Sequence, residues 1–369
     1  MTSKQMFYFI GQCLILDEYP QNRGGIIEEI EKGQFSWELF VQLGSHHLVL
    51  PALYVKLLNA GLLSYLPDEL VLHLKEIFDL NSERNRRILN QVGWLVNLFS
   101  KSNIHPVFLK GAGALLDGLY AYPGERVMND IDCLVSDNDF DKAVQLLKKE
   151  GYSSPAFHSE SLPMMHHYPS LFKPHEPATL EIHRYPVGKR QLKYLNVKEM
   201  KSQLFSSDQA SKSLTLKLHD QVMINFIHSQ LKDHGQYYAN VPLRNIYEFY
   251  RLSLRQDLSE MDLQNGHTGG IFNNYMALAA KIFSPATQFP YKDSFRSKRY
   301  IARLERNKSN RFWYRVSKVS RTIANLLHSY LYISFHSLYV KDYRNHLRVR
   351  LSDRSWYKRH FSIIRSLIS

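Results

Sequence analysis

Two aspartates, Asp130 and Asp132, lie in an apolar stretch over residues 130–135 that predicts a buried strand. Because side chains alternate across a strand, both carboxylates share one face and repel each other. A divalent cation with oxygen ligands would relieve that repulsion, so the pair predicts a site for a divalent metal ion. The alternative is a pair of solvated carboxylates. The apolar flanks argue against it, since burying an unpaired carboxylate costs several kcal/mol.

A second feature is the sequence Lys110-Gly111-Ala112, which lies between a short apolar run and a helical pattern. The run over 106–109 predicts a strand, and residues 114–120 predict a helix. Glycine lets backbone N–H groups approach a phosphate, and a helix N-terminus favours an anion. Lys110 adds a positive charge. The alternative is an ordinary left-handed turn between a strand and a helix.

A third candidate strand, over 178–183, carries Glu181 and His183 on one face. Glu181 could complete a set of three carboxylates with Asp130 and Asp132. His183 could contact phosphate or orient Glu181, and its alternative is a hydrogen-bonded core histidine. Residues 168–172 predict a further strand, which Pro169 would confine to an edge of the sheet.

Helical patterns surround these strands and would have to position them. Apolar residues at three- and four-residue spacing predict helices over 37–43, 50–60 and 70–100 before the first strand. A helix over 137–151, capped by Asp137 or Asn138, would connect two of the strands. Three more helices are expected after the sheet, over 214–232, 242–254 and 276–283.

The ordered set of motifs resembles the nucleotidyltransferase superfamily with the polymerase-beta-like fold, most closely its uncharacterised bacterial branch. The likeness is carried by residues 107–111, Arg126, 130–135 and 180–183, and it extends over residues from about 35 to 255. It implies an α+β fold, with a small mixed sheet flanked by N-terminal and C-terminal helical regions. The sequence departs from the superfamily at Lys110, where the first glycine of the turn would stand, and at Glu181, where many members have Asp.

The resemblance implies a metal-dependent enzyme that transfers a nucleoside monophosphate, most simply AMP, from an NTP to a hydroxyl acceptor. The acceptor is a small molecule, a protein or an RNA. The implied catalytic and metal-binding residues are Asp130, Asp132 and Glu181, holding two Mg²⁺ (or Mn²⁺) ions. The implied nucleotide-binding residues are Lys110, Gly111, Ala112, Arg126 and His183, and His228, Arg244 and Glu248 could contact the base or the acceptor.

Alternatives stay open for some of these residues and for the function. Arg126 could be a surface arginine that bonds a helix C-terminus, and His228 could be a satisfied core histidine. The chain could also bind nucleotide without catalysis, as a scaffold in surface-polysaccharide assembly. A toxin-like nucleotidyltransferase acting on tRNA is a third possibility.

The net charge of +13 is concentrated at one end of the chain. Residues 284–369 contain 19 Lys and Arg against 4 Asp and Glu, whereas the rest of the chain has a net charge of −2. This segment interleaves its cations with aromatic residues, so it could contact nucleic acid or an anionic membrane surface. The alternative is that the aromatic residues pack on the body while the cations are solvated.

We expect four parts along the chain: a helical region over 1–103, a nucleotidyltransferase core over 104–212, helices over 213–283 and the cationic segment over 284–369. The two cysteines, Cys13 and Cys133, predict buried thiols in a reducing compartment. The apolar residues 6–16 lack the features of a signal peptide, and no apolar run is long enough to span a membrane. We therefore expect a cytoplasmic protein that could be peripheral at the inner membrane.

Overall fold

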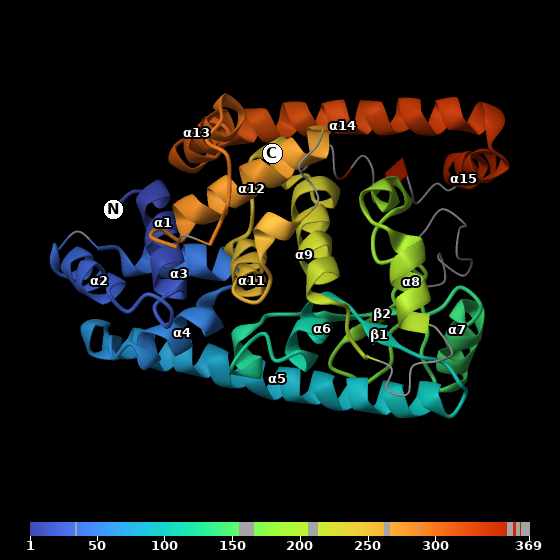
Figure 1. Cartoon of the computed structure of the whole chain (residues 1–369), viewed down its shortest axis with the longest axis horizontal. Helices are drawn as coiled ribbons and strands as arrows, with labels where there is room; N and C mark the ends of the chain where they lie inside the picture. The colour runs from blue at the N-terminus through green and yellow to red at the C-terminus, as the bar shows by residue number, and fades with distance from the viewer. Residues whose placement is uncertain are drawn as a thin grey trace.

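A three-stranded mixed sheet lies near one end of the molecule, among many helices (Figure 1). The computed structural model describes residues 1–33, 35–154, 166–205, 213–261, 266–286, 288–352, 357–358 and 362. The strands β1 (Val107–Phe108), β2 (Asp130–Leu134) and β3 (Thr179–His183) follow one another across the sheet. β1 is antiparallel to β2, and β3 is parallel to β2. The expected α+β class is confirmed.

The connection from β2 to β3 passes through helix α7 (Phe140–Lys149). Its apolar side chains recur at helical spacing, and the burial of Phe140, Ala143, Val144 and Leu147 holds the helix against the sheet. The N-cap is Asp139, so the expected caps Asp137 and Asn138 were wrong. Both residues precede the first helical turn.

The segment over 168–172 forms isolated bridges in place of the expected strand. Leu171 and Leu180 exchange two backbone hydrogen bonds of 2.8 Å, and the N–H of Tyr168 donates to the carbonyl of Ile182. Pro169 has no N–H to contribute to a ladder, which explains why the pairing is interrupted. The segment therefore borders β3 without extending the sheet regularly.

The N-terminal region is helical, as expected. Its long helix α5 (Asp68–Ser100) contributes Leu70 and Leu74 to a large hydrophobic cluster, and Val92, Leu95 and Phe99 to a smaller one beneath the sheet. One helix therefore joins the two clusters. The shorter helices before it are α1 (Ser3–Leu14), α2 (Asn22–Glu31), α3 (Trp37–His46), α4 (Leu50–Asn59) and the 3₁₀ turn η1 (Leu63–Tyr65).

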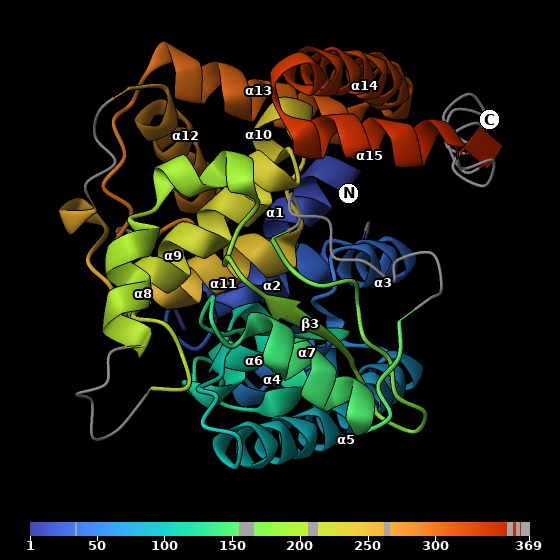
Figure 2. The same cartoon turned by 90° about the vertical axis from the view of Figure 1, so that its right-hand side faces the viewer.

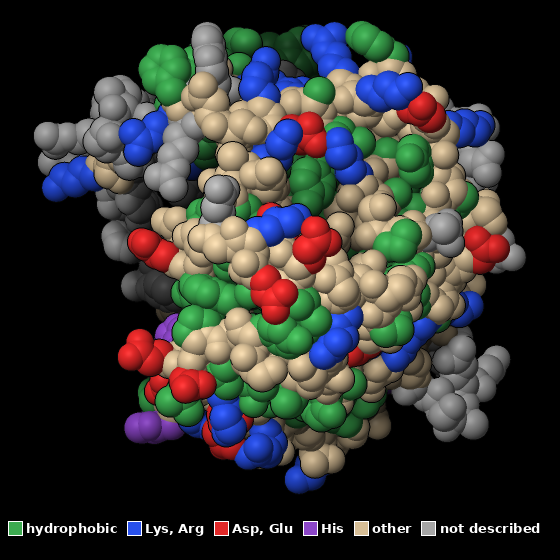
Figure 3. Space-filling view, turned by 90° about the vertical axis from the view of Figure 1, so that its left-hand side faces the viewer, with side chains coloured by type: hydrophobic (Ala, Val, Ile, Leu, Met, Phe, Trp, Pro, Cys, Tyr) green, Lys and Arg blue, Asp and Glu red, His purple; other side chains and the backbone are tan. Residues whose placement is uncertain are grey.

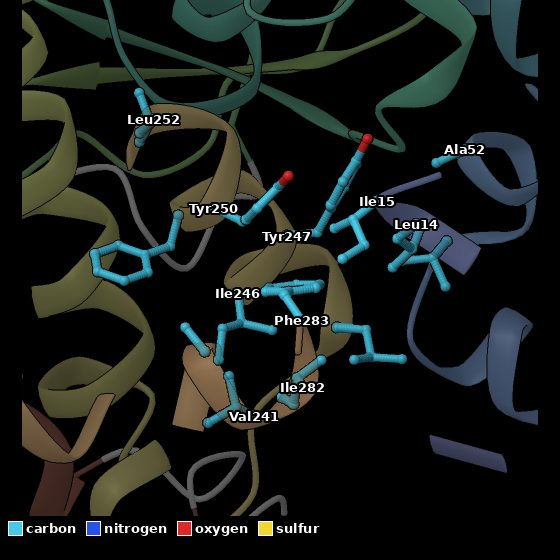
Figure 4. Close-up of a cluster of buried hydrophobic side chains, with 14 of the residues drawn as sticks. Leu14, Ile15, Ala52, Val241, Ile246, Tyr247, Tyr250, Leu252, Ile282 and Phe283 are labelled. Atoms are coloured by element: carbon cyan, nitrogen blue, oxygen red, sulfur yellow. The ribbon is translucent and has the colours of Figure 1, made fainter. Parts of the chain in front are cut away.

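The larger cluster is built from N-terminal helices and from helices that follow the sheet. Tyr247 and Tyr250 stack there, the ring of Phe283 packs against them at an angle, and Leu14 and Ile15 lie close by (Figure 4). Cys13 and Cys133 are buried free thiols, as expected. The remaining elements before the cationic segment are, in chain order, α6 (Lys110–Leu116), η2 (Pro123–Glu125), η4 (Lys189–Tyr194), α8 (Val197–Phe205), α9 (Leu218–Phe226), the π-turn η5 (Ile227–Lys232), α10 (Gly235–Tyr238), α11 (Leu243–Ser253), η6 (Leu258–Glu260) and α12 (Gly266–Ile282).

The cationic segment contains three helices with different surroundings. Helix α13 (Phe295–Ser309) places Tyr300 and Leu304 in the large cluster. Helices α14 (Arg311–Tyr339) and α15 (Lys341–Ser352) lie at the edge of the molecule opposite α5 (Figures 1 and 2).

Lys and Arg side chains are spread over the face shown in Figure 3, including its upper edge. Among the helices that the structure describes, none has the length and apolar character needed to cross a membrane.

Candidate active site

Asp132 is the buried centre of a charged cluster between β2 and β3. It lies opposite Glu181 in the parallel register, and it is only 2% exposed. Its Oδ1 accepts hydrogen bonds from His183 Nε2 at 2.8 Å and from Lys110 Nζ at 2.6 Å. Burial alone would raise the pKa of Asp132, but the hydrogen bond from His183 and the charge of Lys110 hold it below its usual range. Asp132 is therefore an anion with two cationic or hydrogen-donating neighbours.

Glu181 lies beside this cluster on β3. Its Oε2 is 3.6 Å from His183 Nε2 and 3.8 Å from His167 Nε2, and Ser170 Oγ donates to its Oε1 at 2.8 Å. Burial opposes ionisation of Glu181, yet these neighbours outweigh it and lower the pKa to about 2. Asp132, Glu181 and His183 each offer a ligand atom, and these atoms lie within 4.8 Å of one another. The three residues therefore form a group that could hold a metal ion.

Two further histidines, His166 and His167, lie beside His183 of this cluster. The rings of His166 and His183 lie 5.5 Å apart, and the ring of His167 lies 5.0 Å from that of His183. Burial favours the neutral ring of His183, but its bonds to Asp132 and Glu181 raise its pKa. Burial and then the charge of Lys232 lower the pKa of His166. His183 is a fully buried, hydrogen-bonded histidine, as the core-histidine alternative expected. Its partner, however, is the carboxylate of Asp132 in the candidate site.

Asp130 lies at the start of β2, on the strand face that Asp132 also occupies. It is less buried than Asp132 and borders a pocket. Burial and the neighbouring charge of Asp132 raise its pKa, whereas Lys110 lowers it. The structure thus brings Asp130 close to the cluster, although the group of mutually close ligand atoms is Asp132, Glu181 and His183.

Lys110 begins helix α6 with a left-handed backbone, at φ +49°. This conformation is unfavourable for a residue with a Cβ, and it is one that glycine adopts freely. The turn also needs a glycine at Gly113, where a Cβ would lie 2.5 Å from the carbonyl oxygen of Phe108. Lys110 therefore occupies a position suited to glycine, and its ammonium contacts Asp132.

A pocket of about 220 Å³ opens beside Asp130, between α6, α9, the π-turn η5 and α11. Lys232 and Asp233, on or beside η5, contribute to its lining and were not expected from the sequence. Ala112, Asp132, Glu181 and His183 do not line it, and Ala112 is buried in the cluster beneath the sheet. The expected residues that do line it are Lys110, Gly111, Arg126, Asp130, His228, Arg244 and Glu248.

Arg126 is buried and paired, so the alternative of a surface arginine was wrong. Its Nε donates to Glu248 Oε2 at 2.5 Å, and Tyr120 Oη donates to the same oxygen at 3.4 Å. Glu248 also accepts a hydrogen bond from Asn225 at 3.4 Å. The charge of Arg126 is thus neutralised within the protein.

The loop before Asp130 is held by amides on α5 that the sequence analysis did not single out. Asn81 Nδ2 donates to the carbonyl of Gly124 at 2.6 Å, and Asn85 Nδ2 donates to that of Arg126 at 2.7 Å. Arg84 contacts the carbonyl of Met128. Buried polar side chains on the packed face of a helix require hydrogen-bond partners. Asparagines at buried positions of α5 are therefore the signal that could have identified these residues.

Two cations of the pocket have no carboxylate partner within 4.0 Å among the described residues. Burial, followed by the charge of Arg126, lowers the pKa of Arg244 to about 10. Burial and the charge of Lys110 lower the pKa of Lys232. His228 Nε2 lies 3.4 Å from the carbonyl oxygen of Pro186, and burial holds its pKa well below the usual range. Asp130 and Asp233 also line the pocket, so Lys232 and Arg244 are the cations there that no ion pair holds among the described residues and that an anionic ligand would contact.

Comparison with known proteins identifies the family. Residues 33–265 match the family described as uncharacterised nucleotidyltransferase, and this range covers more than half of the chain. The chain therefore belongs to that family, which supports a role in nucleotidyl transfer. No curated protein and no solved structure matches the chain.

Proposed function

We propose that the protein transfers a nucleoside monophosphate, most simply AMP, from an NTP to a hydroxyl acceptor. The observation that carries this proposal is the adjacency of Asp132, Glu181 and His183 to a cation-lined pocket bordered by Asp130. An NTP brings a polyanion that suits the pocket, and the carboxylates suit divalent cations.

The pocket side chains would bind and orient the nucleotide. Lys110, Lys232 and Arg244 would neutralise the triphosphate. The first hydrogen bond of helix α6 runs from the N–H of Gly113 to the carbonyl of Leu109. The N–H of Gly111 lies before it and would therefore be available to a phosphate. Arg126 is already paired with Glu248, so we assign it to positioning of the pocket wall.

The charged cluster fits a divalent cation, because it offers two carboxylates and one imidazole within a short distance. Asp132, Glu181 and His183 would hold the ion, with Asp130 as a further oxygen ligand toward the pocket. Mg²⁺ or Mn²⁺, when bound, would neutralise phosphate charge and acidify the acceptor hydroxyl. The imidazole favours Mn²⁺ over Mg²⁺, since Mg²⁺ prefers oxygen ligands alone.

The reaction is an in-line displacement at the α-phosphorus. The acceptor oxygen forms a bond to that phosphorus, the bond to the bridging oxygen breaks, and pyrophosphate leaves. Asp130, which borders the pocket and whose pKa is raised by burial and by the charge of Asp132, would accept the hydroxyl proton. Asp130 would keep the acceptor oxygen on the pocket side of the cluster.

One observation favours a second candidate, a protein that binds nucleotide without transferring it. Lys110 Nζ contacts Asp132 at 2.6 Å and thereby provides a positive charge next to the carboxylate that would bind a metal ion. If Lys110 kept this place in the presence of nucleotide, Asp132 would remain an ion-pair partner and catalysis would be lost.

The test incubates the full chain with each α-labelled NTP, Mg²⁺ or Mn²⁺, and cell extract. We expect a labelled product that depends on the metal and falls at least about a hundredfold in Asp132→Asn. A variant of an exposed carboxylate outside the site, Asp68→Asn, should retain activity. Equal labelling by wild type and Asp132→Asn would refute the transfer reaction. Nucleotide binding without labelled product from the wild type would support the second candidate.

A further inference from the structure

Helix α14 presents an apolar stripe to solvent along most of its length. Successive helical residues turn by about 100°, so the stripe residues fall within an arc of about 120°. Their exposed fractions lie between 43% and 70%. The stripe consists of Val316, Ile323, Leu327, Leu331, Phe335 and Leu338.

The opposite side of α14 faces the body of the protein. Tyr314 Oη accepts a hydrogen bond from Asn240 at 3.4 Å, and the ring of Tyr332 lies 3.8 Å from the guanidinium of Arg190. Thr322 is within hydrogen-bond distance of Tyr238. These contacts account for the helix being held in place, and they leave the stripe pointing outward.

The charge of α14 and α15 is separated along the chain from five of the six stripe residues, all but Val316. Residues 311–352 contain eight Lys and Arg and one Asp, but residues 322–340 contain no Lys, Arg, Asp or Glu. The exposed cations therefore precede and follow an uncharged length of helix. They include Arg315 and Lys318 on α14 and Lys341, Arg344 and Arg348 on α15.

We propose that α14 and α15 lie on the surface of an anionic lipid bilayer, with the stripe in the boundary between headgroups and acyl chains. An uncharged apolar face with cations at both ends fits that surface, because acyl chains take the stripe and anionic headgroups take the cations. Long Lys and Arg side chains beyond the ends of the uncharged length can extend to headgroups. This proposal is independent of the transfer reaction.

The distribution of charge argues against two other binding partners for the stripe, a second copy of the chain and a nucleic acid. A second copy would bring the same cationic segment against this one, and like charges oppose such pairing. A nucleic acid would need cations along the surface that it follows, whereas the stripe offers apolar side chains over the uncharged residues 322–340. An anionic bilayer is the occupant that uses both the stripe and the cations.

The first experiment sediments the full chain with vesicles of phosphatidylcholine mixed with phosphatidylglycerol, and with phosphatidylcholine alone. Wild type should bind the anionic vesicles more tightly. Leu327→Ser, Leu331→Ser and Phe335→Ser together should weaken partitioning at least about tenfold. The matched control is Leu72→Ser with Leu80→Ser, because these leucines of α5 are 67% and 65% exposed and should not affect binding.

The second experiment tests the cations with paired neutral substitutions. Lys341→Gln with Arg348→Gln should weaken binding to anionic vesicles by roughly fivefold for each residue. Lys101→Gln with Lys149→Gln removes two exposed lysines from the body and should have little effect.

Three results would overturn the proposal. The first is wild type that stays in the supernatant with anionic vesicles, and the second is a triple serine variant that sediments as wild type does. The third is a wild-type dimer in the absence of lipid that the triple variant abolishes, which would identify a second copy as the occupant. Unchanged thermal unfolding of the variants would show that they are folded.

Discussion

The pocket region and the α14–α15 helices place polar and apolar side chains in opposite ways. Around Asp132, charged groups are buried, and they are held by hydrogen bonds and by one another. Along α14, large apolar groups are exposed, and Leu331 is 70% exposed. Buried charge and exposed apolar surface both oppose the usual distribution in a folded protein. These two departures are the observations behind our two proposals, an anion with its metal in the first region and a lipid surface in the second.

The largest effect on stability should come from breaking the buried pair of Arg126 and Glu248. Arg126→Met leaves the carboxylate of Glu248 without its cation in a buried position, which should lower the free energy of unfolding by about 3–5 kcal/mol. Urea unfolding measures the change. In the double variant with Glu248→Gln, much of the loss should be recovered because no isolated buried charge remains.

A loss below about 1 kcal/mol in Arg126→Met would contradict this prediction. The pair would then behave as a solvated one, and the contrast between the pocket and the α14–α15 helices would disappear. The matched surface pair is Lys75 and Asp79 on α5, whose side chains are 55% and 54% exposed. Lys75→Met should leave the free energy of unfolding nearly unchanged.

The next effect contrasts two leucines, one in each kind of surrounding. Leu95 on α5 is fully buried beneath the sheet, so Leu95→Ala should cost about 2–5 kcal/mol through lost burial and a cavity. Leu331→Ala removes the same atoms from an exposed position and should change the free energy of unfolding by no more than about 0.5 kcal/mol.

Chemical denaturation in the absence of lipid compares these two leucine variants. A large loss in Leu331→Ala would show that the stripe packs against protein in solution. The proposed lipid surface would then have to displace that contact.

The sequence could predict which residues share a strand face, because alternation is a local property. Asp130 and Asp132 lie on β2 and Glu181 and His183 lie on β3, at the positions that the pattern indicated. The parallel register that brings Asp132 opposite Glu181 depends on the path of the chain through α7. The sequence pattern alone did not specify it.

The pocket walls were less predictable, because their partners are far apart in the chain. Arg126 and Glu248 are separated by 122 residues, so burial of that pair follows only from how α11 packs beside the sheet. Lys232 and Asp233 form no motif, and they reach the pocket because of the π-turn η5. The apolar stripe of α14 could be read from periodicity, whereas its exposure depends on which face contacts the body.

A pH-dependent effect on stability should test whether α13, the first helix of the cationic segment, is packed against the body of the protein. Lys308 on α13 has its Nζ 3.0 Å from His47 Nε2 and 4.3 Å from the ring centroid of Phe7. Burial lowers its pKa from 10.5 to about 8. Between these values the unfolded chain holds the proton and the folded chain does not, so the contribution of this group to stability rises with pH.

Lys308→Met removes that titration. Below pH 8 the variant should be more stable than wild type by up to about 3 kcal/mol, and the advantage should shrink as the pH rises toward 10.5. Lys318→Met on α14 is the control, because it makes the same substitution at an exposed lysine. Denaturation curves at neutral and alkaline pH measure both variants. A pH-independent difference for Lys308→Met would place α13 with the solvated α14–α15 helices.

The smallest effect tests the strained backbone of Lys110. Lys110→Gly and Lys110→Ala both remove the ammonium from Asp132, so they lose the same ion pair. They differ in the backbone conformation at φ +49°, which is strained for alanine because of its Cβ and unstrained for glycine. The free energy of unfolding of Lys110→Gly should therefore be the larger by about 1 kcal/mol. At Lys75, inside helix α5, the order should reverse, because glycine costs about 1 kcal/mol relative to alanine there. The sign of the difference at Lys110 is therefore decisive. If alanine is the better residue, the backbone is not left-handed in solution, and the ammonium reaches Asp132 by another route.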